Sequence, residues 1–217
     1  MCFSAEVSFG AGAVIAAIGV ATLRKAETTP QQLFAGIPLF FAVQQFTEGA
    51  LWLTLDDPSG SELNSWLSRM FLFFAWVIWP AYIPFTMRQL ETHTTRRNIL
   101  TVFLIMGLMV SVLHIYHLIF HHVHAQAEGA HIRYLMDYQP KYPWVIGAFY
   151  FIAIVVSLFV SSAKRMIYLA VMVLTTFIIT ISFFQEHQIS VWCFFAAVTS
   201  LMVLWVLDGV KKASKAT

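Results

Sequence analysis

Residues 98–120, with the sequence NILTVFLIMGLMVSVLHIYHLIF, contain no Asp, Glu, Lys or Arg and are long enough to cross a bilayer as one helix. The same bias extends over all 217 residues, of which 59% are hydrophobic and 11% are charged. A water-soluble globule of this size cannot hide so many apolar side chains. We therefore predict an all-α, polytopic membrane protein. This excludes a separate soluble catalytic domain, a nucleic-acid-binding domain and a disulfide-stapled secreted fold.

Hydrophobic runs separated by charged residues, Pro or Gly predict seven transmembrane helices that form a single domain over residues 1–217. The expected spans lie near 5–23, 33–54, 64–87, 98–120, 142–162, 166–184 and 189–208. The longest connection, about 121–141, is rich in His, and we expect a short interfacial helix there.

The distribution of Lys and Arg gives each span a direction, because short basic loops stay in the cytoplasm. Ten basic residues fall on one side: Arg24, Lys25, Arg88, Arg96, Arg97, Lys164, Arg165, Lys211, Lys212 and Lys215. Only Arg133 and Lys141 fall on the other side, and Arg69 lies within the third span. We predict an N-terminus outside, a C-terminus in the cytoplasm and a location in the bacterial inner membrane, with the lipid bilayer as the main partner.

In this orientation the polar residues of the spans gather at the outer end, where their burial in hydrocarbon indicates a function or a partner. They are Cys2 and Glu6 in the first span, Gln44, Gln45, Glu48 and Trp52 in the second, Arg69 in the third, His114, His117 and His121 in the fourth, and Gln185, Glu186, His187, Trp192 and Cys193 around the start of the seventh. The inner half of the membrane contains fewer such residues.

The histidines of the fourth span follow the pattern H-x2-H-x3-H, which places His114, His117 and His121 within one arc of a helix. The i, i+4 spacing of His117 and His121 allows two imidazoles to bind one metal ion. A haem held by histidines on facing helices, such as His117 and His187, stays an alternative cofactor.

Glu48 has two interpretations of similar weight. An ionised Glu in the outer half of a span either protonates or finds a cation. It can therefore serve as a metal ligand or catalytic acid and base, or it can form an ion pair with Arg69, the one basic residue inside a predicted span.

Both cysteines of the chain, Cys2 and Cys193, are expected at the outer end. They can form a disulfide in an oxidising periplasm or share a soft metal ion as two thiolates. A set of Cys and His ligands suits copper or zinc better than magnesium or calcium, which prefer oxygen ligands.

In the third span, Trp76, Trp79 and Tyr82 lie close to Pro80 and Pro84. Prolines inside a helix cause kinks, so we expect a kinked span. Such a kink can open a cavity, and ordinary packing of the aromatic side chains is the alternative.

Three stretches carry a resemblance to a bacterial family of multi-span membrane proteins of unknown function: Met-Cys-Phe-Ser-Ala at 1–5 with Ser-Phe at 8–9, Phe-Ala-Val-Gln-Gln-Phe-Thr-Glu-Gly at 41–49 with Trp52, and Val-Trp-Cys-Phe-Phe at 191–195. The resemblance covers nearly the whole chain but implies no activity. It implies a shared site at Cys2, Gln45, Glu48, Trp192 and Cys193.

The chain is also similar, more distantly, to membrane zinc hydrolases of the alkaline ceramidase type. That similarity implies seven spans, an outward N-terminus and a histidine-bound zinc. The paired histidines of this chain lie on the fourth span, with none inside the seventh, so the similarity supports only an alternative function.

We interpret the outer cluster as a metal site, with copper favoured over zinc, that serves redox chemistry or metal handling. Its ligands or their close neighbours are Cys2, His114, His117, His121, Cys193 and Glu48. A metal donor or a small-molecule substrate would reach it from the periplasmic side.

One alternative is a membrane-embedded zinc hydrolase of a lipid or small amide, with Glu48 as the catalytic base. Another is a small-molecule or proton-coupled transporter. The sequence leaves open the oligomeric state and whether the protein is an enzyme.

Overall fold

The chain forms long helices, which keep their backbone hydrogen bonds within one segment as a bilayer requires. The computed structural model describes residues 4–55, 62–138 and 140–214, without the side chains of 193, 194, 196, 197, 213 and 214. Within these ranges, seven helical segments follow one another. They are α1 (Ala5–Lys25), α2 and α3 (Thr29–Ala35 and Ile37–Trp52), α4, η1 and α5 (Glu62–Leu72, Phe73–Ile78 and Trp79–Leu90), α6 (Thr94–Phe120), α7, η2 and α8 (Pro143–Phe151, Ile152–Val156 and Ser157–Val160), α9 (Met166–Phe183) and α10 (Gln188–Ser214).

Five helices in the described part of the chain are long and apolar enough to cross a membrane. They are Ala5–Lys25, Glu62–Leu90, Thr94–Phe120, Pro143–Val160 and Met166–Phe183. They correspond to the first and the third to sixth expected spans. The second expected span is divided, because α2 ends at Ala35 and α3, with Pro38 in its first turn, has only 16 residues.

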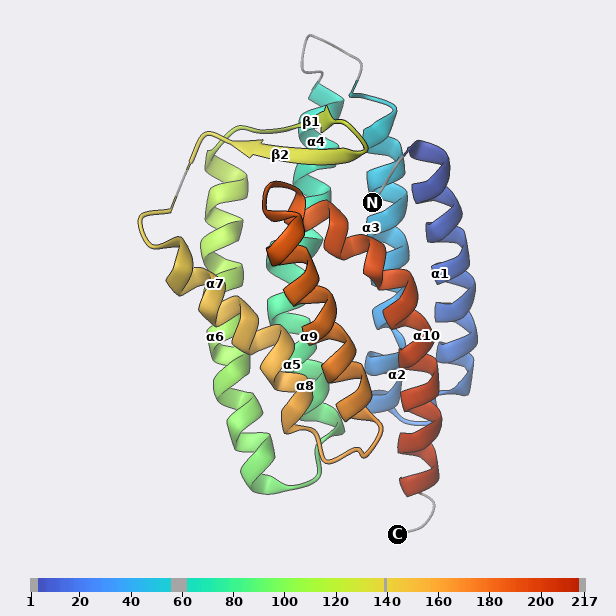
Figure 1. Cartoon of the computed structure of the whole chain (residues 1–217). Helices are drawn as coiled ribbons and strands as arrows, with labels where there is room; N and C mark the ends of the chain where they lie inside the picture. Colours follow the sequence, from blue (N-terminus) through green and yellow to red (C-terminus); the bar gives the residue numbers. More distant parts are fainter. Residues whose placement is uncertain (1–3, 56–61, 139, 215–217) are drawn as a thin grey trace.

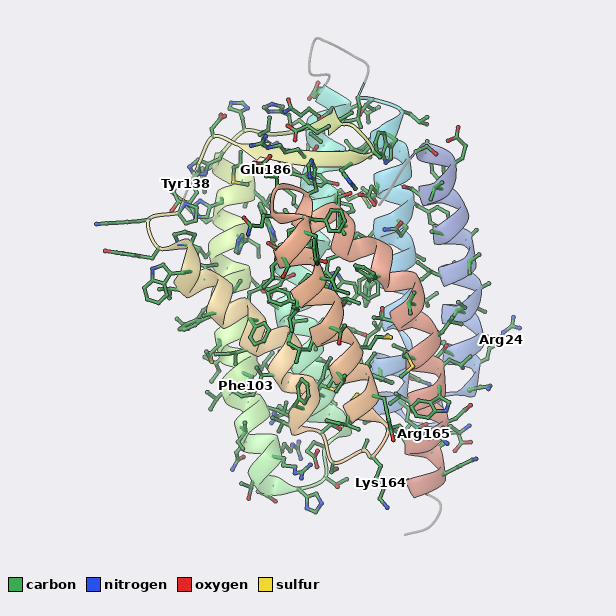
Figure 2. The ribbon with its side chains drawn as sticks, viewed as in Figure 1. Arg24, Phe103, Tyr138, Lys164, Arg165 and Glu186 are labelled. Atoms are coloured by element: carbon green, nitrogen blue, oxygen red, sulfur yellow. The ribbon has the colours of Figure 1, made fainter. Side chains whose placement is uncertain are left out.

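The helices form one bundle in which α1 packs along α3, and α10 packs against α1, α3 and α9. On the opposite side, α6 packs along α5 and against α7 (Figure 1). Figure 2 shows Lys164 and Arg165 near the end of the bundle where the C-terminus lies, and Tyr138 and Glu186 toward the opposite end. We call the end that carries Tyr138 and Glu186 the outer end.

The connection expected to hold a short helix forms a β-hairpin instead, so that prediction was wrong and the fold is not purely α-helical. Strands β1 (Val123–Glu128) and β2 (His131–Met136) pair antiparallel, and Gly129 takes the positive φ of 63° that the tight turn needs. The hairpin lies across the outer end of the bundle (Figure 1).

Helix α4 contacts the hairpin through Phe71, which stacks on Tyr134 with ring centroids 5.0 Å apart, and through hydrogen bonds of Asn64. The amide of Asn64 donates to the carbonyl of Ala125 at 3.1 Å and accepts from its backbone N–H at 2.9 Å, so it pairs with the strand as a neighbouring strand would.

The third helical segment is irregular, as the prolines predict. Residues Phe73–Ile78 form a π-helix, and Pro80 and Pro84 lie in α5 directly after it. A wider turn and a missing proline N–H both leave backbone carbonyls without a partner in their own helix. Neighbouring helices must therefore supply the donors.

Side chains from α6 and α7 supply two of these donors. The hydroxyl of Ser111 lies 2.7 Å from the Val77 carbonyl, and the hydroxyl of Tyr150 donates to the Ala75 carbonyl at 2.7 Å. The carbonyl of Pro80, which Pro84 cannot satisfy, lies directly against Gly107, where an added Cβ would overlap it. Gly107 thus permits the close approach of α5 and α6.

Replacing Gly107 by Ala should therefore destabilise the protein by roughly 1–3 kcal/mol, because a packed interface must separate to admit the new methyl group. We expect a lower thermal unfolding midpoint in detergent. The matched control is Gly10→Ala on the exposed face of α1, where a Cβ meets nothing within 4 Å and no loss is expected. Equal midpoints for the two variants would contradict the close contact.

Candidate functional site

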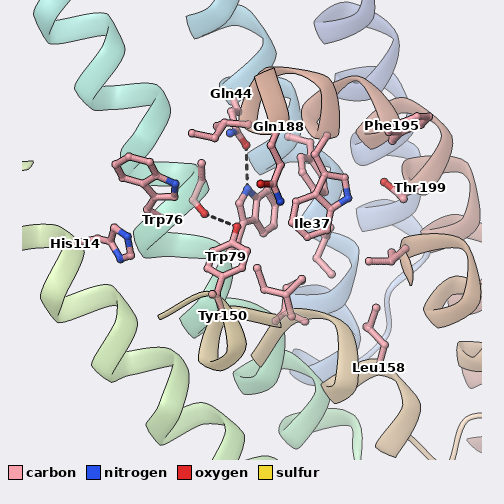
Figure 3. A pocket seen from close by; sticks show the side chains of 18 of the residues that line it. Ile37, Gln44, Trp76, Trp79, His114, Tyr150, Leu158, Gln188, Phe195 and Thr199 are labelled. Atoms are coloured by element: carbon pink, nitrogen blue, oxygen red, sulfur yellow. Dashed lines mark hydrogen bonds between the residues drawn. The ribbon is translucent and has the colours of Figure 1, made fainter. Parts of the chain in front are cut away.

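An elongated cavity of about 380 Å³ lies inside the bundle (Figure 3). Its walls come from α3, η1, α5, α6, α7, η2, α8, α9 and α10. The side chains are mainly aliphatic and aromatic: Ile37, Phe41, Trp76, Trp79, Ile83, Ile146, Tyr150, Ile154, Leu158, Leu169, Val173, Ile189, Trp192, Phe195 and Val203 are among them. Its volume is within the usual range of small-molecule sites, roughly 300–1,000 Å³.

The space arises because the helices around the irregular third segment separate. Helix α7 packs on α6, whereas α9 packs on η2 and α8, the inner half of the same segment. At its outer end the cavity is lined by α7 and by the start of α10, through Pro143, Gly147 and Gln188. An added Cβ at Gly147 would meet no atom within 4 Å.

Trp79 forms the central wall and is fixed on two sides. Its ring stacks on Phe41 at a centroid distance of 4.0 Å, and its indole N–H donates to Gln44 Oε1 at 2.9 Å. Both partners belong to α3, and Figure 3 shows the bond between Trp79 and Gln44. The hydrogen bond from Trp79 explains why the polar side chain of Gln44 is buried in the apolar helix α3.

At the outer end, His114 and Trp76 lie side by side with ring centroids 5.0 Å apart. His114 Nδ1 is 2.8 Å from the Val110 carbonyl, which can only accept, so Nδ1 carries the hydrogen. In the neutral ring, Nε2 is then a hydrogen-bond acceptor. Gln188 reaches the cavity from the first position of α10 (Figure 3).

Glu48 is fully buried, with 0% of its surface exposed, and lies between α3 and α10. The Ser190 hydroxyl donates to Oε1 at 2.9 Å, and the Gln45 amide donates to Oε2 at 3.3 Å. The carboxyl therefore has both oxygens bonded to neutral donors. Glu48 is not among the described residues that line the cavity, although Gln44 on the same helix is.

Arg69 does not pair with Glu48 in the described structure. Its Nη2 donates to the carbonyl of His121 at 3.3 Å, and its Nε is buried without a hydrogen-bond partner. Arg69 thus caps the carboxyl end of α6 rather than neutralising the acid of α3. No ion pair between Arg69 and Glu48 is found among the described contacts, and the metal-ligand and acid–base interpretations of Glu48 stay predictions.

The paired histidines of α6 do come together, with ring centroids of His117 and His121 5.1 Å apart. Tyr138 stacks on His117 at 3.8 Å with an interplanar angle of 19°. His117 is only 6% exposed, and neither of its ring nitrogens has a hydrogen-bond partner. The buried Nδ1 of His121 has none either.

The predicted ligands do not form one cluster within the described residues. Glu48 lies between α3 and α10, while His114, His117 and His121 lie on α6. No group of three or more His, Cys, Asp or Glu side chains that could hold a metal ion is found among the residues searched. Cys2 lies outside the described residues, and of Cys193 only the backbone in α10 is described. The complete ligand set therefore stays a prediction.

A charged network holds the hairpin over the outer end. Arg133 Nη1 donates to Glu128 Oε1 at 2.9 Å and lies 3.4 Å from Glu186 Oε2, and His187 Nε2 lies 3.2 Å from Glu128 Oε2. The hydrogen bond from Arg133 is the largest cause of the lowered pKa of Glu128, and it raises the pKa of Arg133 itself. These contacts link β1 and β2 to η3 (Gln185–His187), directly before Gln188.

Sequence reasoning did not identify Trp76 or Gln188 as parts of a site. The prolines after Trp76 gave one usable signal, since a kinked span can open a cavity. Gln188 gave none, because a glutamine at the start of a helix is ordinary. Gln188 lines the cavity because α10 begins at the cavity's outer end, which α7 also lines, and the sequence does not show this arrangement.

Comparisons with known proteins identify a family but no characterised relative. The sequence matches the family described as "Family of unknown function (DUF6629)" over residues 1–217. No curated protein matches, and no solved structure matches.

The Ser190→Ala variant should be less stable by roughly 1–3 kcal/mol, because it removes a donor from a fully buried carboxyl. Thermal unfolding in one detergent measures the loss, and Ser190→Thr, which keeps a hydroxyl, should recover part of it. Thr175→Ala is the control, since the exposed Thr175 bonds only to the Val171 carbonyl of its own helix. A midpoint for Ser190→Ala equal to that of the control would contradict this role of Ser190.

Proposed function

We propose that this chain, which belongs to the DUF6629 family of unknown function, is an integral membrane protein. We propose further that it binds a mainly apolar small molecule within its helix bundle. The site is the cavity between α3, η1, α7 and α10. The protein crosses the bacterial inner membrane seven times, with its N-terminus outside and its C-terminus in the cytoplasm.

The observation that carries this proposal is the cavity of about 380 Å³ in the apolar part of the bundle. Six aromatic side chains face it: Phe41, Trp76, Trp79, Tyr150, Trp192 and Phe195. Such rings provide large contact areas for hydrocarbon. A bilayer supplies apolar and amphipathic molecules at high local concentration, so a cavity of this kind at membrane depth favours a lipid-like ligand.

The basic residues at one end of the bundle support the proposed orientation, in which that end faces the cytoplasm. At the inner end, Lys25 pairs with Asp208 at 3.5 Å, and Lys211 pairs with Glu27 at 2.8 Å, which joins the ends of α1 and α10. Most of the remaining basic residues lie in helix ends at that same end of the bundle, among them Arg24, Arg88, Arg96 and Arg97. This distribution is typical of a cytoplasmic face.

Binding can be tested by quenching of tryptophan fluorescence with a brominated monoacylglycerol in nanodiscs of unbrominated lipid. Trp76, Trp79 and Trp192 face the cavity and should give a saturable component. The exposed Trp66 and Trp144 should give only a gradual background.

The Gly147→Leu variant should weaken the saturable component at least about tenfold, because the side chain enters open space inside the cavity and displaces ligand. Gly10→Leu is the matched control, since its Cβ also meets open space but lies outside the cavity. Wild-type protein without a saturable component would overturn the proposal, as would identical binding by both variants.

A metal centre is the second candidate, and the buried His117 favours it. Leaving both ring nitrogens of a buried imidazole without a partner costs free energy, which a bound cation would remove. His117 and His121 would be two ligands, and Cys2 and Cys193 are the predicted thiolates that would complete a copper or zinc site. His114 and Glu48 bond to other protein groups and take no direct part in this version of the site.

Metal analysis and an absorption spectrum of purified protein test this candidate. We expect about one copper or zinc ion per chain, lost in His117→Ala, and for copper a thiolate band lost in Cys2→Ser. The control is His124→Ala, an exposed position on β1. Wild-type metal content in His117→Ala would contradict the site.

The hydrolase and transporter alternatives both depend on Glu48. Glu48 is not among the described residues that line the cavity, which favours binding over reaction, since a general base must reach its substrate directly or through one water. Both alternatives stay predictions.

A further inference from the structure

Most polar groups on the cavity wall are already bonded to the protein. The indole of Trp79 donates to Gln44 at 2.9 Å, and the indole of Trp192 donates to Thr176 Oγ1 at 3.3 Å. The hydroxyl of Tyr150 donates to the Ala75 carbonyl at 2.7 Å. These three donors are therefore directed away from a ligand.

Three polar side chains at the outer end have hydrogen-bonding groups that are not bonded to the described protein. His114 offers Nε2 as an acceptor, because its Nδ1 is bonded to Val110. The indole N–H of Trp76 and the amide of Gln188 have no hydrogen-bond partner within the described ranges. A head group at this end can thus both donate and accept.

The described wall contains no Asp, Glu, Lys or Arg. A charged cluster at the hairpin, formed by Glu128, Arg133, Glu186 and His187, is bonded within itself. The buried Glu48 bonds to Ser190 and Gln45. An ionised head group in an apolar site needs a partner of opposite charge, and none faces the cavity. The charge of the wall thus disfavours carboxylates, phosphates and quaternary amines alike.

The rest of the cavity suits a hydrocarbon tail. It extends along α10 from Gln188 to Val203, a rise of about 22 Å at about 1.5 Å per residue. Toward Val203 the wall is formed by Ile154, Leu158 and Leu169 among others. Polar groups at the outer end and aliphatic groups below them match a ligand with one polar head.

We propose that the ligand is an uncharged amphiphile with a hydroxyl head, which donates to His114 Nε2 and accepts from Trp76 or Gln188. This inference rests on the proposed ligand-binding function and adds the chemical class of the ligand. The hydroxyl belongs either to a glyceride or to a quinol, which share this chemistry.

The test compares brominated alkyl probes with the same tail and different heads, by saturable quenching in nanodiscs. The heads are an alcohol, a methyl ether, a carboxylate and a trimethylammonium group. The methyl ether accepts but cannot donate, so it isolates the contribution of His114 Nε2. We expect the alcohol to bind about tenfold more tightly than the ether and at least about a hundredfold more tightly than either charged probe.

The outcomes separate this inference from the function on which it rests. If no probe gives saturable quenching, the proposed binding function fails. If the carboxylate or the ammonium probe binds as tightly as the alcohol, or the ether equals the alcohol, the cavity still binds ligands but the hydroxyl class is wrong. If the alcohol binds most tightly, a brominated monoacylglycerol and a brominated quinol identify the source of the hydroxyl.

Variants assign the head-group contacts. His114→Phe should bring the alcohol down to the affinity of the ether while leaving the ether unchanged, a pattern that a general loss of structure would not give. Gln188→Leu is the second variant and should reduce the preference for alcohol less strongly. Unchanged alcohol preference in both variants would overturn the assignment.

Discussion

The arrangement of this bundle depends on backbone carbonyls that its third helical segment cannot satisfy by itself. Pro80 and Pro84 have no N–H, so the carbonyls of Ala75 and Pro80 cannot bond to them in the π-helix and α-helix register. In hydrocarbon no water can replace these donors. The hydroxyl of Tyr150 on α7 bonds to the Ala75 carbonyl, the hydroxyl of Ser111 on α6 lies 2.7 Å from the Val77 carbonyl, and α6 approaches the Pro80 carbonyl closely at Gly107, so that both helices are held in place.

The same constraint produces the cavity. Tyr150 must reach Ala75, which holds α7 against the irregular segment, while α9 packs on η2 and α8 at the inner end. At the outer end this space is lined by Pro140 and Pro143 before and at the start of α7 and by Gln188 at the start of α10. Irregular backbone at membrane depth is typical of proteins in which it lines a cavity. Here the described lining contains no Asp, Glu, Lys or Arg and is mainly aliphatic and aromatic.

The sequence predicted the helices well because hydrophobic length and charge act locally. It did not predict the hairpin at 123–136, whose attachment depends on Asn64 from a distant helix. It placed Glu48 and His117 at the same depth in the membrane. Equal depth does not determine which neighbouring helix each side chain faces. Glu48 consequently faces Ser190, and His117 faces Tyr138. From the sequence, an ion pair with Arg69 was one of two interpretations of Glu48, whereas in the structure Arg69 donates to the carbonyl of His121 at the carboxyl end of α6.

Native mass spectrometry of the protein released from its own membrane tests the central claim most directly. The account predicts one retained, uncharged amphiphile on the wild type and on Gly10→Leu, and its loss from Gly147→Leu, whose side chain fills the cavity. A protein that carries no bound amphiphile, or that retains the same molecule in Gly147→Leu, would contradict the account.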